Sequence, residues 1–453
     1  MTATTLLIES LKGIALDKNE YVDLLRKLIG VSRNVQNNPR QGMIPKESFV
    51  ANHVLSVLDP YRVEKGGPLI IKELIYMEGR PNLKITFPGS DPVKTTGLIG
   101  SHMDVVPANP ETWKRDPFEL SFEEDDKLYG RGTTDCLGHV AMITLLLKAL
   151  AIKKPQLKRS VIALFIAGEE GGETGVGVDM VVKHGEIDEL KNGTCYWIDS
   201  ADSQPCVGTA GAMQWHLKAT GRLFHSGLPH RGINSIELAS EAVGIIQRRF
   251  YEDFPPHPEE SKYGFATPST MKPTQVECAK GSLNQICPWT IMSGDIRLTP
   301  FYDPVAVMQT VEGYIRDLNT KMDGDTIPTR GPVSKYTLQG DDIDVKSGKL
   351  EITWTDDTES VRQMEGIACD LESPGLKAIS DATLEVKGEC KPYAITGSLP
   401  LVRQMQKEGF DIQITGYGLS KTYHADNEYS LLSDMVDAFQ ILLRIISISD
   451  EQK

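Results

Sequence analysis

The feature that most constrains this chain is a set of short apolar runs, each followed almost at once by His, Asp or Glu. The runs and the residues that follow them are 95–101 with His102, 160–167 with Glu169 and Glu170, and 195–198 with Asp199. Apolar runs rich in β-branched residues are typical of strands buried on both faces of a sheet. Sites in α/β proteins gather beyond the carboxyl ends of such strands. The pattern therefore predicts an α/β fold in which these side chains share one site.

Helices are predicted to alternate with these strands. Apolar residues recur on one helical face over 17–31 and 46–58, and the apolar segment 139–150 is typical of a helix packed on a sheet. Asp17 and Glu20 form a capping pair at the first helix. Alternating strands and helices indicate a layered α/β architecture.

Beyond residue 210 the pattern of elements changes. The predicted order is strand 213–221, helix 234–250, strands 274–280 and 290–298, and helix 304–318. This β-α-β-β-α order is that of a split βαβ unit. The region 323–345 is rich in turn residues and predicts a loop. We therefore expect a catalytic domain formed by 1–210 and 361–453, with an α+β domain inserted over 211–360 and a final helix over 431–448.

Composition excludes several classes of protein. The net charge of −14 argues against a nucleic-acid-binding face, and the absence of an 18-residue apolar stretch argues against a membrane span. Seven scattered cysteines without a C-x-x-C pair favour a reducing compartment over a disulfide framework or a Cys-type zinc site. The segment 1–12 lacks the basic and apolar regions of a signal peptide. We expect a cytoplasmic protein.

Five polar motifs together predict a metal centre. They are Ser-His-Met-Asp at 101–104, Gly-Arg-Gly-Thr-Thr-Asp at 130–135, Ala-Gly-Glu-Glu-Gly at 167–171, Ile-Asp at 198–199, and Thr-Tyr-His-Ala-Asp-Asn-Glu at 422–428. Divalent cations bind imidazole nitrogen and carboxylate oxygen, and a two-metal hydrolytic site needs about this many ligands. Cys136 near His139 suggests a thiol nucleophile as a weaker alternative, because no ordering residue accompanies the pair.

In combination these motifs resemble the M20 family of co-catalytic zinc hydrolases, over nearly the whole chain. The segments 263–274 and 395–401 resemble the family's eukaryotic branch that acts on N-acetylornithine. The resemblance implies a three-layer zinc-hydrolase domain with an inserted lid or dimerisation domain, and the hydrolysis of N-acetylornithine to ornithine and acetate in arginine biosynthesis. A dipeptidase or aminoacylase of the same family, and a non-catalytic binding protein stabilised by metals, remain alternatives.

The resemblance also implies the metal ligands. Two divalent ions, Zn or Co, would share Asp135. The other ligands would be His102 and Asp199 for one ion, and Glu170 and His424 for the other. Asp202 remains a competitor for the role of Asp199.

Two further carboxylates would act without binding metal. The resemblance implies that Glu169 is the general base and that Asp104 orients the imidazole of His102, as carboxylate–histidine–metal triads do. In relatives the peptide bond after the bridging Asp is cis, which here is the bond between Asp135 and Cys136.

The inserted domain would contribute to the site of a partner subunit in a homodimer. His225 matches the family histidine that reaches across the dimer to stabilise the oxyanion. Asn284 and Arg297 match residues that hold the substrate, an N-acyl amino acid. Gly397 and Ser398 would line the pocket.

Overall fold

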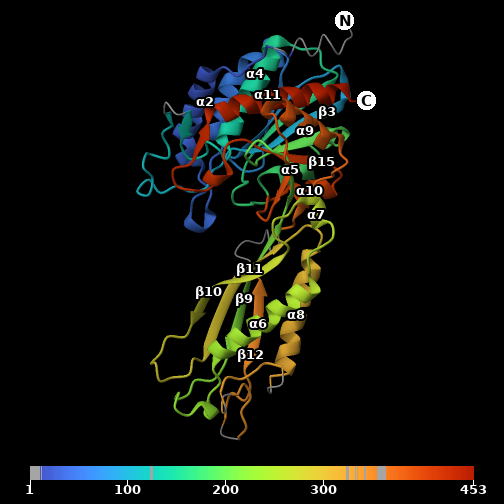
Figure 1. The fold of residues 1–453 in the computed structure, drawn as a ribbon. Helices are drawn as coiled ribbons and strands as arrows, with labels where there is room; N and C mark the ends of the chain where they lie inside the picture. Colours follow the sequence, from blue (N-terminus) through green and yellow to red (C-terminus); the bar gives the residue numbers. More distant parts are fainter. Residues whose placement is uncertain are drawn as a thin grey trace. The chain divides into compact units, whose positions relative to one another are not determined.

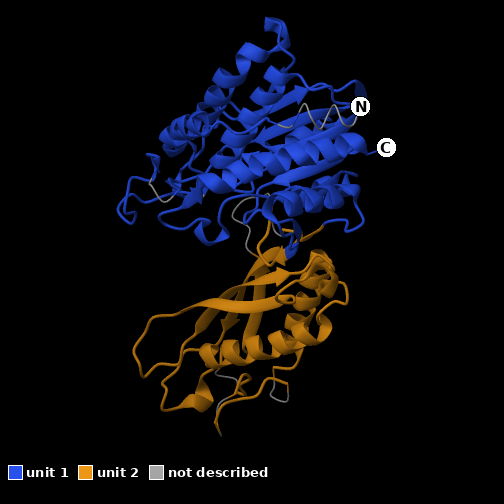
Figure 2. Cartoon of the chain, turned by 45° about the horizontal axis from the view of Figure 1, so that its top comes forward, with its two compact units in different colours: residues 1–207, 369–393, 400–453 blue, residues 208–368, 394–399 orange. Residues whose placement is uncertain are grey.

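The computed structural model describes residues 11, 13–122, 126–322, 326–331, 333, 335–340, 343–354 and 364–452. Most of the segment 1–12 and part of the predicted loop 323–345 therefore lie outside the described residues. The chain divides into two compact units (Figure 2). Unit 1 comprises 1–207, 369–393 and 400–453, and unit 2 comprises 208–368 and 394–399. The contacts thus group 394–399 with the inserted unit, although the sequence-based division placed them in the catalytic domain.

Unit 1 contains several helices (Figure 1). They are α2 (Lys18–Val31), α3 (Ser48–Leu58), α4 (Leu137–Lys153), α5 (Val178–Lys183), α9 (Pro374–Lys387), α10 (Val402–Lys407) and α11 (Leu432–Glu451). All of them except α5 and α10 contribute residues to one large apolar core. The Asp17 half of the predicted capping pair is confirmed, because the Asp17 carboxylate accepts hydrogen bonds from the backbone N–H groups of Asn19 and Glu20, whereas the Glu20 carboxylate pairs with Lys148. α4 is buried along almost its whole length, since α2, α3 and α11 all pack on it.

The main sheet of unit 1 runs in the order β1-β2-β6-β3-β7-β15. The strands are β1 (Ile70–Ile75), β2 (Pro81–Phe87), β3 (Asp91–His102), β6 (Arg159–Ile166), β7 (Thr194–Ile198) and β15 (Asp411–Thr415). β6, β3, β7 and β15 are parallel to one another, whereas β1 and β2 add an antiparallel edge that the sequence did not predict.

Both faces of this sheet are covered. On β6, Val161 and Phe165 belong to the core beneath the helices, while Ile162 and Leu164 point to the opposite face and are also buried. This confirms the interpretation of 160–167 as a doubly covered strand, and the predicted α/β layer fold is confirmed with it. The parallel direction of β3, β6 and β7 brings their carboxyl ends to one edge.

A small second sheet lies next to this edge. It runs in the order β16-β5-β4, formed by β16 (Tyr429–Leu431), β5 (Lys127–Tyr129) and β4 (Ser121–Phe122). β16 pairs antiparallel with β5, with Tyr429 opposite Tyr129. This pairing brings the segment 422–428 next to the loop 130–135, although the two are far apart in the sequence.

Unit 2 is a four-stranded antiparallel sheet packed against helices. The sheet runs in the order β10-β11-β9-β12, formed by β10 (Thr270–Cys278), β11 (Trp289–Leu298), β9 (Gly211–Thr220) and β12 (Lys349–Trp354). The helices are α6 (Ser235–Asp253), α7 (Glu260–Tyr263) and α8 (Pro304–Thr320). The split βαβ order is confirmed, but β12 was not predicted, because its apolar residues alternate over only six positions.

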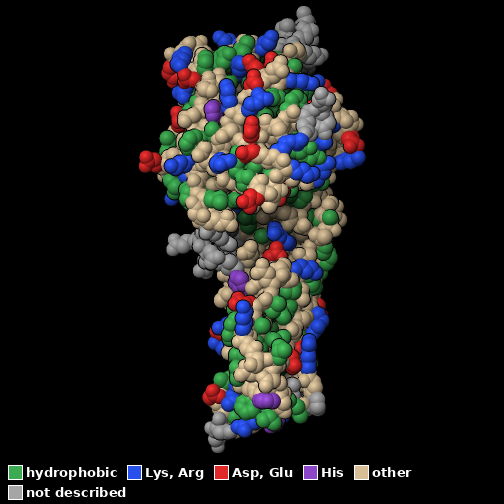
Figure 3. Space-filling view, turned by 90° about the vertical axis from the view of Figure 1, so that its left-hand side faces the viewer, with side chains coloured by type: hydrophobic (Ala, Val, Ile, Leu, Met, Phe, Trp, Pro, Cys, Tyr) green, Lys and Arg blue, Asp and Glu red, His purple; other side chains and the backbone are tan. Residues whose placement is uncertain are grey.

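The surface carries charges of both signs. On the face in Figure 3, Lys and Arg side chains are interspersed with Asp and Glu side chains. Among the described helices, none combines the length and the hydropathy that crossing a membrane requires.

Candidate functional site

The carboxyl ends of the parallel strands deliver most of the predicted site residues. His102 is the last residue of β3, Asp199 directly follows β7, and Glu169 lies in the turn after β6. All three are buried. Gly100 of β3 permits this packing, since its φ is +90° and a Cβ there would lie 2.6 Å from the ring of Trp197 on β7.

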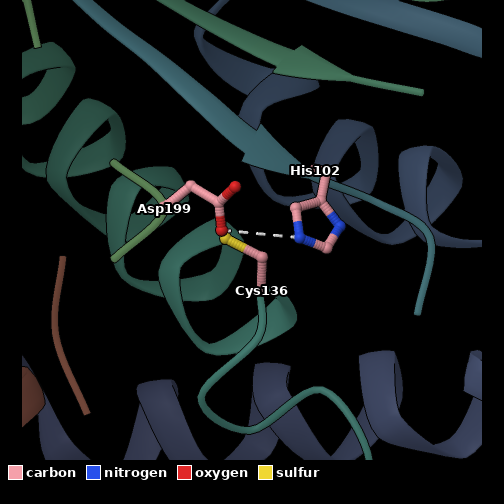
Figure 4. Close-up of side chains that lie close together, drawn as sticks. All are labelled: His102, Cys136 and Asp199. Atoms are coloured by element: carbon pink, nitrogen blue, oxygen red, sulfur yellow. Dashed lines mark ion pairs between the residues drawn. The ribbon is translucent and has the colours of Figure 1, made fainter. Parts of the chain in front are cut away.

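Two sets of ligand atoms meet at Asp135. Its Oδ1 lies 2.9 Å from His102 Nε2, and its Oδ2 lies 3.1 Å from His424 Nε2. Asp199 Oδ1 lies 3.6 Å from the same nitrogen of His102, a pair drawn in Figure 4. Glu170 Oε2 lies 3.2 Å from His424 Nε2. The five residues that the resemblance implied as metal ligands therefore lie together, in two sets that share one carboxylate.

Asp104 contacts both His102 and the turn that carries Glu169 and Glu170. Its backbone oxygen is 2.9 Å from His102 Nδ1, which leaves Nε2 of that ring directed at Asp135. Its carboxylate accepts hydrogen bonds from the backbone N–H groups of Glu169, at 3.2 Å, and Glu170, at 3.0 Å. Asp104 therefore positions the turn that carries the two glutamates as well as the imidazole.

The turn after β6 has a second support that sequence reasoning missed. The buried Glu47 carboxylate accepts a hydrogen bond from the N–H of Gly168 at 3.1 Å and pairs with Arg80 at 2.7 Å. Arg80 also pairs with Glu173, beyond the turn. Asn37 in turn donates to Asp104 Oδ2 at 2.8 Å. Asn37, Glu47 and Arg80 come from the first ninety residues, where no motif marked them.

Burial first, and charge repulsion after it, raise the pKa values of three carboxyl groups in the cluster. Burial, and then the negative charge of Asp199, raises the pKa of Glu169 well above its ordinary value. Burial and the charge of Asp135 raise the pKa of Glu170 to about 7, and burial also raises the pKa of Asp199. Hydrogen bonds from His424 to Asp135 and Glu170 raise the pKa of that histidine to about 11. This set of nitrogen and oxygen donors contains more negative than positive charge, so it fits divalent cations.

Asp202 lies apart from the cluster. It is exposed, and its Oδ1 accepts a hydrogen bond from the backbone N–H of Ser420 at 3.0 Å. Asp199, in contrast, is buried beside His102. The geometry therefore favours Asp199 over Asp202 as a ligand.

Cys136 is placed against the cluster but is not suited to act as a nucleophile. Its Sγ lies 3.0 Å from His139 Nδ1, and burial raises the pKa of its thiol well above the ordinary value. Together with His102 and Asp199 it forms one of the groups of side chains close enough to hold an ion (Figure 4). The peptide bond between Asp135 and Cys136 is cis, as the resemblance implied.

Glu428 is a site residue that the sequence did not reveal, although it belongs to a quoted motif. Its buried carboxylate accepts hydrogen bonds from the backbone N–H groups of Gly132, Thr134 and Asp135, at 2.8–3.1 Å. It also pairs with the buried Arg131 at 2.7 Å. Glu428 therefore holds the loop that ends on Asp135.

We expect Glu428→Gln to lower the free energy of unfolding by about 3–5 kcal/mol, because it leaves the Arg131 charge buried without a counter-ion. Chemical denaturation of the variant and the wild type would measure the difference. The matched control is Glu20→Gln, which breaks an exposed pair with Lys148 and should cost less than about 1 kcal/mol. Equal losses in the two variants would contradict the role assigned to Glu428.

Within unit 2, the structure separates the predicted residues into two groups. His225 is exposed and lies beside Asn284, whose backbone oxygen accepts a hydrogen bond from Ser226 N–H at 2.8 Å. Arg297 is near the other end of β11, where its Nε lies 2.8 Å from Asp295 Oδ2. The strand between Trp289 and Arg297 spans about 26 Å at 3.3 Å per residue.

Gly397 and Ser398 belong to the Arg297 end of unit 2. The backbone oxygen of Gly397 accepts a hydrogen bond from Ala210 N–H at 2.9 Å. Ala210 directly precedes β9, and on β9 Ala212 is paired with Arg297. His225 and Asn284 therefore form one group, while Arg297, Gly397 and Ser398 form another.

Comparisons with known proteins found a matching family and several similar proteins. The pattern of the peptidase family M20/M25/M40 matches residues 98–448. The chain is 53% identical to the acetylornithine deacetylase of Arabidopsis thaliana over 443 residues, which cover 97% of each chain. It is 47% identical to the acetylornithine deacetylase of Dictyostelium discoideum, with 96% of this chain and 98% of that one covered. The Bacillus subtilis YXEP protein, a dinuclear metal-binding M20 peptidase, matches in fold with a TM-score of 0.58, at 13% identity over 95% of this chain and 99% of the other.

Proposed function

This chain belongs to the peptidase family M20/M25/M40, and on that premise we propose that it hydrolyses N-acetylornithine to ornithine and acetate, a reaction of arginine biosynthesis. The observation that supports amide hydrolysis is that two sets of ligands share Asp135 and that Glu169 lies beside them. The choice of N-acetylornithine is supported by the likeness to the two deacetylases. The chain is a metallohydrolase, and its substrate is an acylated amino acid.

We propose that the metal centre takes two divalent ions, Zn or Co, since both suit a shell of nitrogen and oxygen donors. His102, Asp135 and Asp199 would hold one ion, and Asp135, Glu170 and His424 the other. Such a pair of ions lowers the pKa of a water molecule and polarises the carbonyl that it attacks. The likeness in fold to a dinuclear metal-binding peptidase supports the number of ions.

Glu169 is the proposed general base. Its carboxylate lies beside the shared ligands, 3.9 Å from His102 Nε2, and it takes the proton of the attacking water. It then passes that proton to the amine nitrogen as the carbon–nitrogen bond breaks, which yields acetate and ornithine. Asp104 keeps the turn of Glu169 in place through the backbone hydrogen bond.

The separation inside unit 2 supports a homodimer. His225 and Asn284 lie beyond the Trp289 end of β11 and Arg297 lies near its other end, and the strand from Trp289 to Arg297 is about 26 Å long. An acylated amino acid is shorter than this span. His225 and Arg297 of one copy of unit 2 therefore cannot both contact the same substrate molecule. We propose that His225 and Asn284 act on the substrate of the partner subunit, while Arg297, Gly397 and Ser398 act within their own.

His225→Ala should lower kcat by about 10²–10³-fold with two metal ions still bound, because it removes one donor to the developing oxyanion. Mixing it with Glu169→Gln after reversible dissociation tests the contribution of the partner. Hybrid dimers contain one site with both Glu169 and His225, so activity should reappear on mixing. Failure to recover activity from verified hybrids would contradict the proposed dimer site.

We propose the cytoplasm as the protein's location. All seven cysteines are free thiols, four of them buried, which supports a reducing compartment.

The test of the proposed function is ornithine release from N-acetylornithine by the purified protein, before and after chelation. N-acetylmethionine and a dipeptide are the comparison substrates. We expect chelator-sensitive turnover that favours N-acetylornithine and returns when Zn or Co is added. Preference for the dipeptide or for N-acetylmethionine would replace the biosynthetic role with that of a peptidase or an aminoacylase. Metal binding without any turnover would support a binding protein.

A further inference from the structure

Tyr423, the residue before His424, holds a hydroxyl group that has no hydrogen-bond partner among the described residues. The residue as a whole is partly exposed, but its hydroxyl oxygen is buried. A buried hydroxyl without a partner is costly, because it has lost its hydrogen bonds to water. Such a group is expected where a ligand supplies the missing partner.

The backbone around Tyr423 has a defined conformation. The 3-10 turn Ser420–Thr422 ends on it, and its own N–H donates to the backbone oxygen of Ser420 at 3.3 Å. The hydroxyl of Thr422 lies 2.9 Å and 3.1 Å from the backbone oxygens of Leu419 and Tyr429. The backbone that carries Tyr423 is therefore held in place on both sides of the turn.

The groups around Tyr423 are those of the metal centre. Burial is the largest influence on its pKa, and the charges of Asp135 and Asp199 follow, all of which raise the pKa well above the ordinary value. The next residue, His424, contacts Asp135 at 3.1 Å. Tyr423 thus directly precedes a residue that contacts Asp135, and its own hydroxyl donates to none of the described residues.

We propose that Tyr423 Oη donates a hydrogen bond to an acyl oxygen of the ligand, bound next to Asp135 and Asp199. In the reaction this is the carbonyl oxygen, which gains negative charge when water attacks; after the reaction it is an oxygen of acetate. Tyr423 is then a catalytic residue that stabilises the oxyanion from within its own subunit, in addition to His225 from the partner. This inference rests on the proposed function.

Tyr423→Phe removes only the hydroxyl and is the test variant. Tyr417→Phe is the matched control, because Tyr417 also has a buried hydroxyl without a partner but belongs to the main apolar core. For both variants and the wild type, we would measure the melting temperature, the metal content, kcat and KM for N-acetylornithine, and the affinity of the zinc-loaded protein for acetate by calorimetry.

For Tyr423→Phe we expect kcat to fall by about 10²-fold with KM nearly unchanged, because the lost donor acts mainly on the developing charge. Acetate affinity should fall, metal content should stay the same, and the melting temperature should be equal to or above that of the wild type, since no internal hydrogen bond is lost. Tyr417→Phe should keep the kcat and the acetate affinity of the wild type.

Two results would overturn the inference. One is a lower melting temperature in Tyr423→Phe alone, since its hydroxyl would then already have a partner in the free protein. The other is unchanged acetate affinity, or no acetate binding by the wild type. If the wild type does not cleave N-acetylornithine, the proposed function fails, but acetate affinity and melting temperature still decide the role of Tyr423.

Discussion

Glu169→Gln should lower kcat by about 10²–10⁴-fold, the range that a positioned general base contributes. The metal content should not change, because Glu169 lies 3.9 Å from His102 Nε2, outside the close contacts that join the proposed ligands. The neutral amide also relieves the repulsion from Asp199 that helps to raise the pKa of Glu169. The metal-free variant should therefore be at least as stable as the metal-free wild type. Steady-state kinetics, metal analysis and thermal unfolding measure the three quantities.

The adjacent carboxylate is the matched control for this experiment. Glu170→Gln removes a group that lies 3.2 Å from His424 Nε2, so it should lower metal content together with turnover. The two variants would then differ: Glu169→Gln would lose turnover but keep its metal ions, whereas Glu170→Gln would lose metal as well. Loss of metal from Glu169→Gln, or turnover within a few-fold of the wild type, would show that the roles are wrongly divided.

Asp135→Asn should remove both metal ions and with them all turnover. Asp135 is the residue common to the two ligand sets, and each of its oxygens faces a different histidine. An amide has no negative charge to share between two cations, and its nitrogen cannot coordinate like a carboxylate oxygen. Metal analysis after dialysis against a fixed free zinc concentration would give the number of ions bound per chain.

Asp202→Asn is the control for that variant, because Asp202 is exposed and lies apart from the cluster. It should keep two ions and the turnover of the wild type. If Asp135→Asn still binds two ions, Asp135 is not the shared ligand. If Asp202→Asn loses one, Asp202 takes the place assigned to Asp199.

The sequence by itself determined the strands that precede His102, Glu169 and Asp199, the main helices and the order of the candidate ligands. Apolar periodicity is a local property, so the buried strand before Glu169 and the capped helix after Asp17 could be read from neighbouring residues. A rule of α/β folds then placed His102 and Asp199 at one edge, because parallel strands end there together. The importance of Asp135 and His424 came from the resemblance, since their loops have no such periodicity.

Only the tertiary structure decided which residues support this site. Glu428 holds the loop of Asp135 through partners nearly three hundred positions away, and Glu47 reaches Gly168 across 121 positions. The hydroxyl of Tyr423 could not be known to lack a partner until its surroundings were in place. Such pairings depend on how distant segments pack, and the residue types alone do not specify them. The spacing of apolar residues therefore determined where the ligands emerge, whereas long-range packing decided what holds them there.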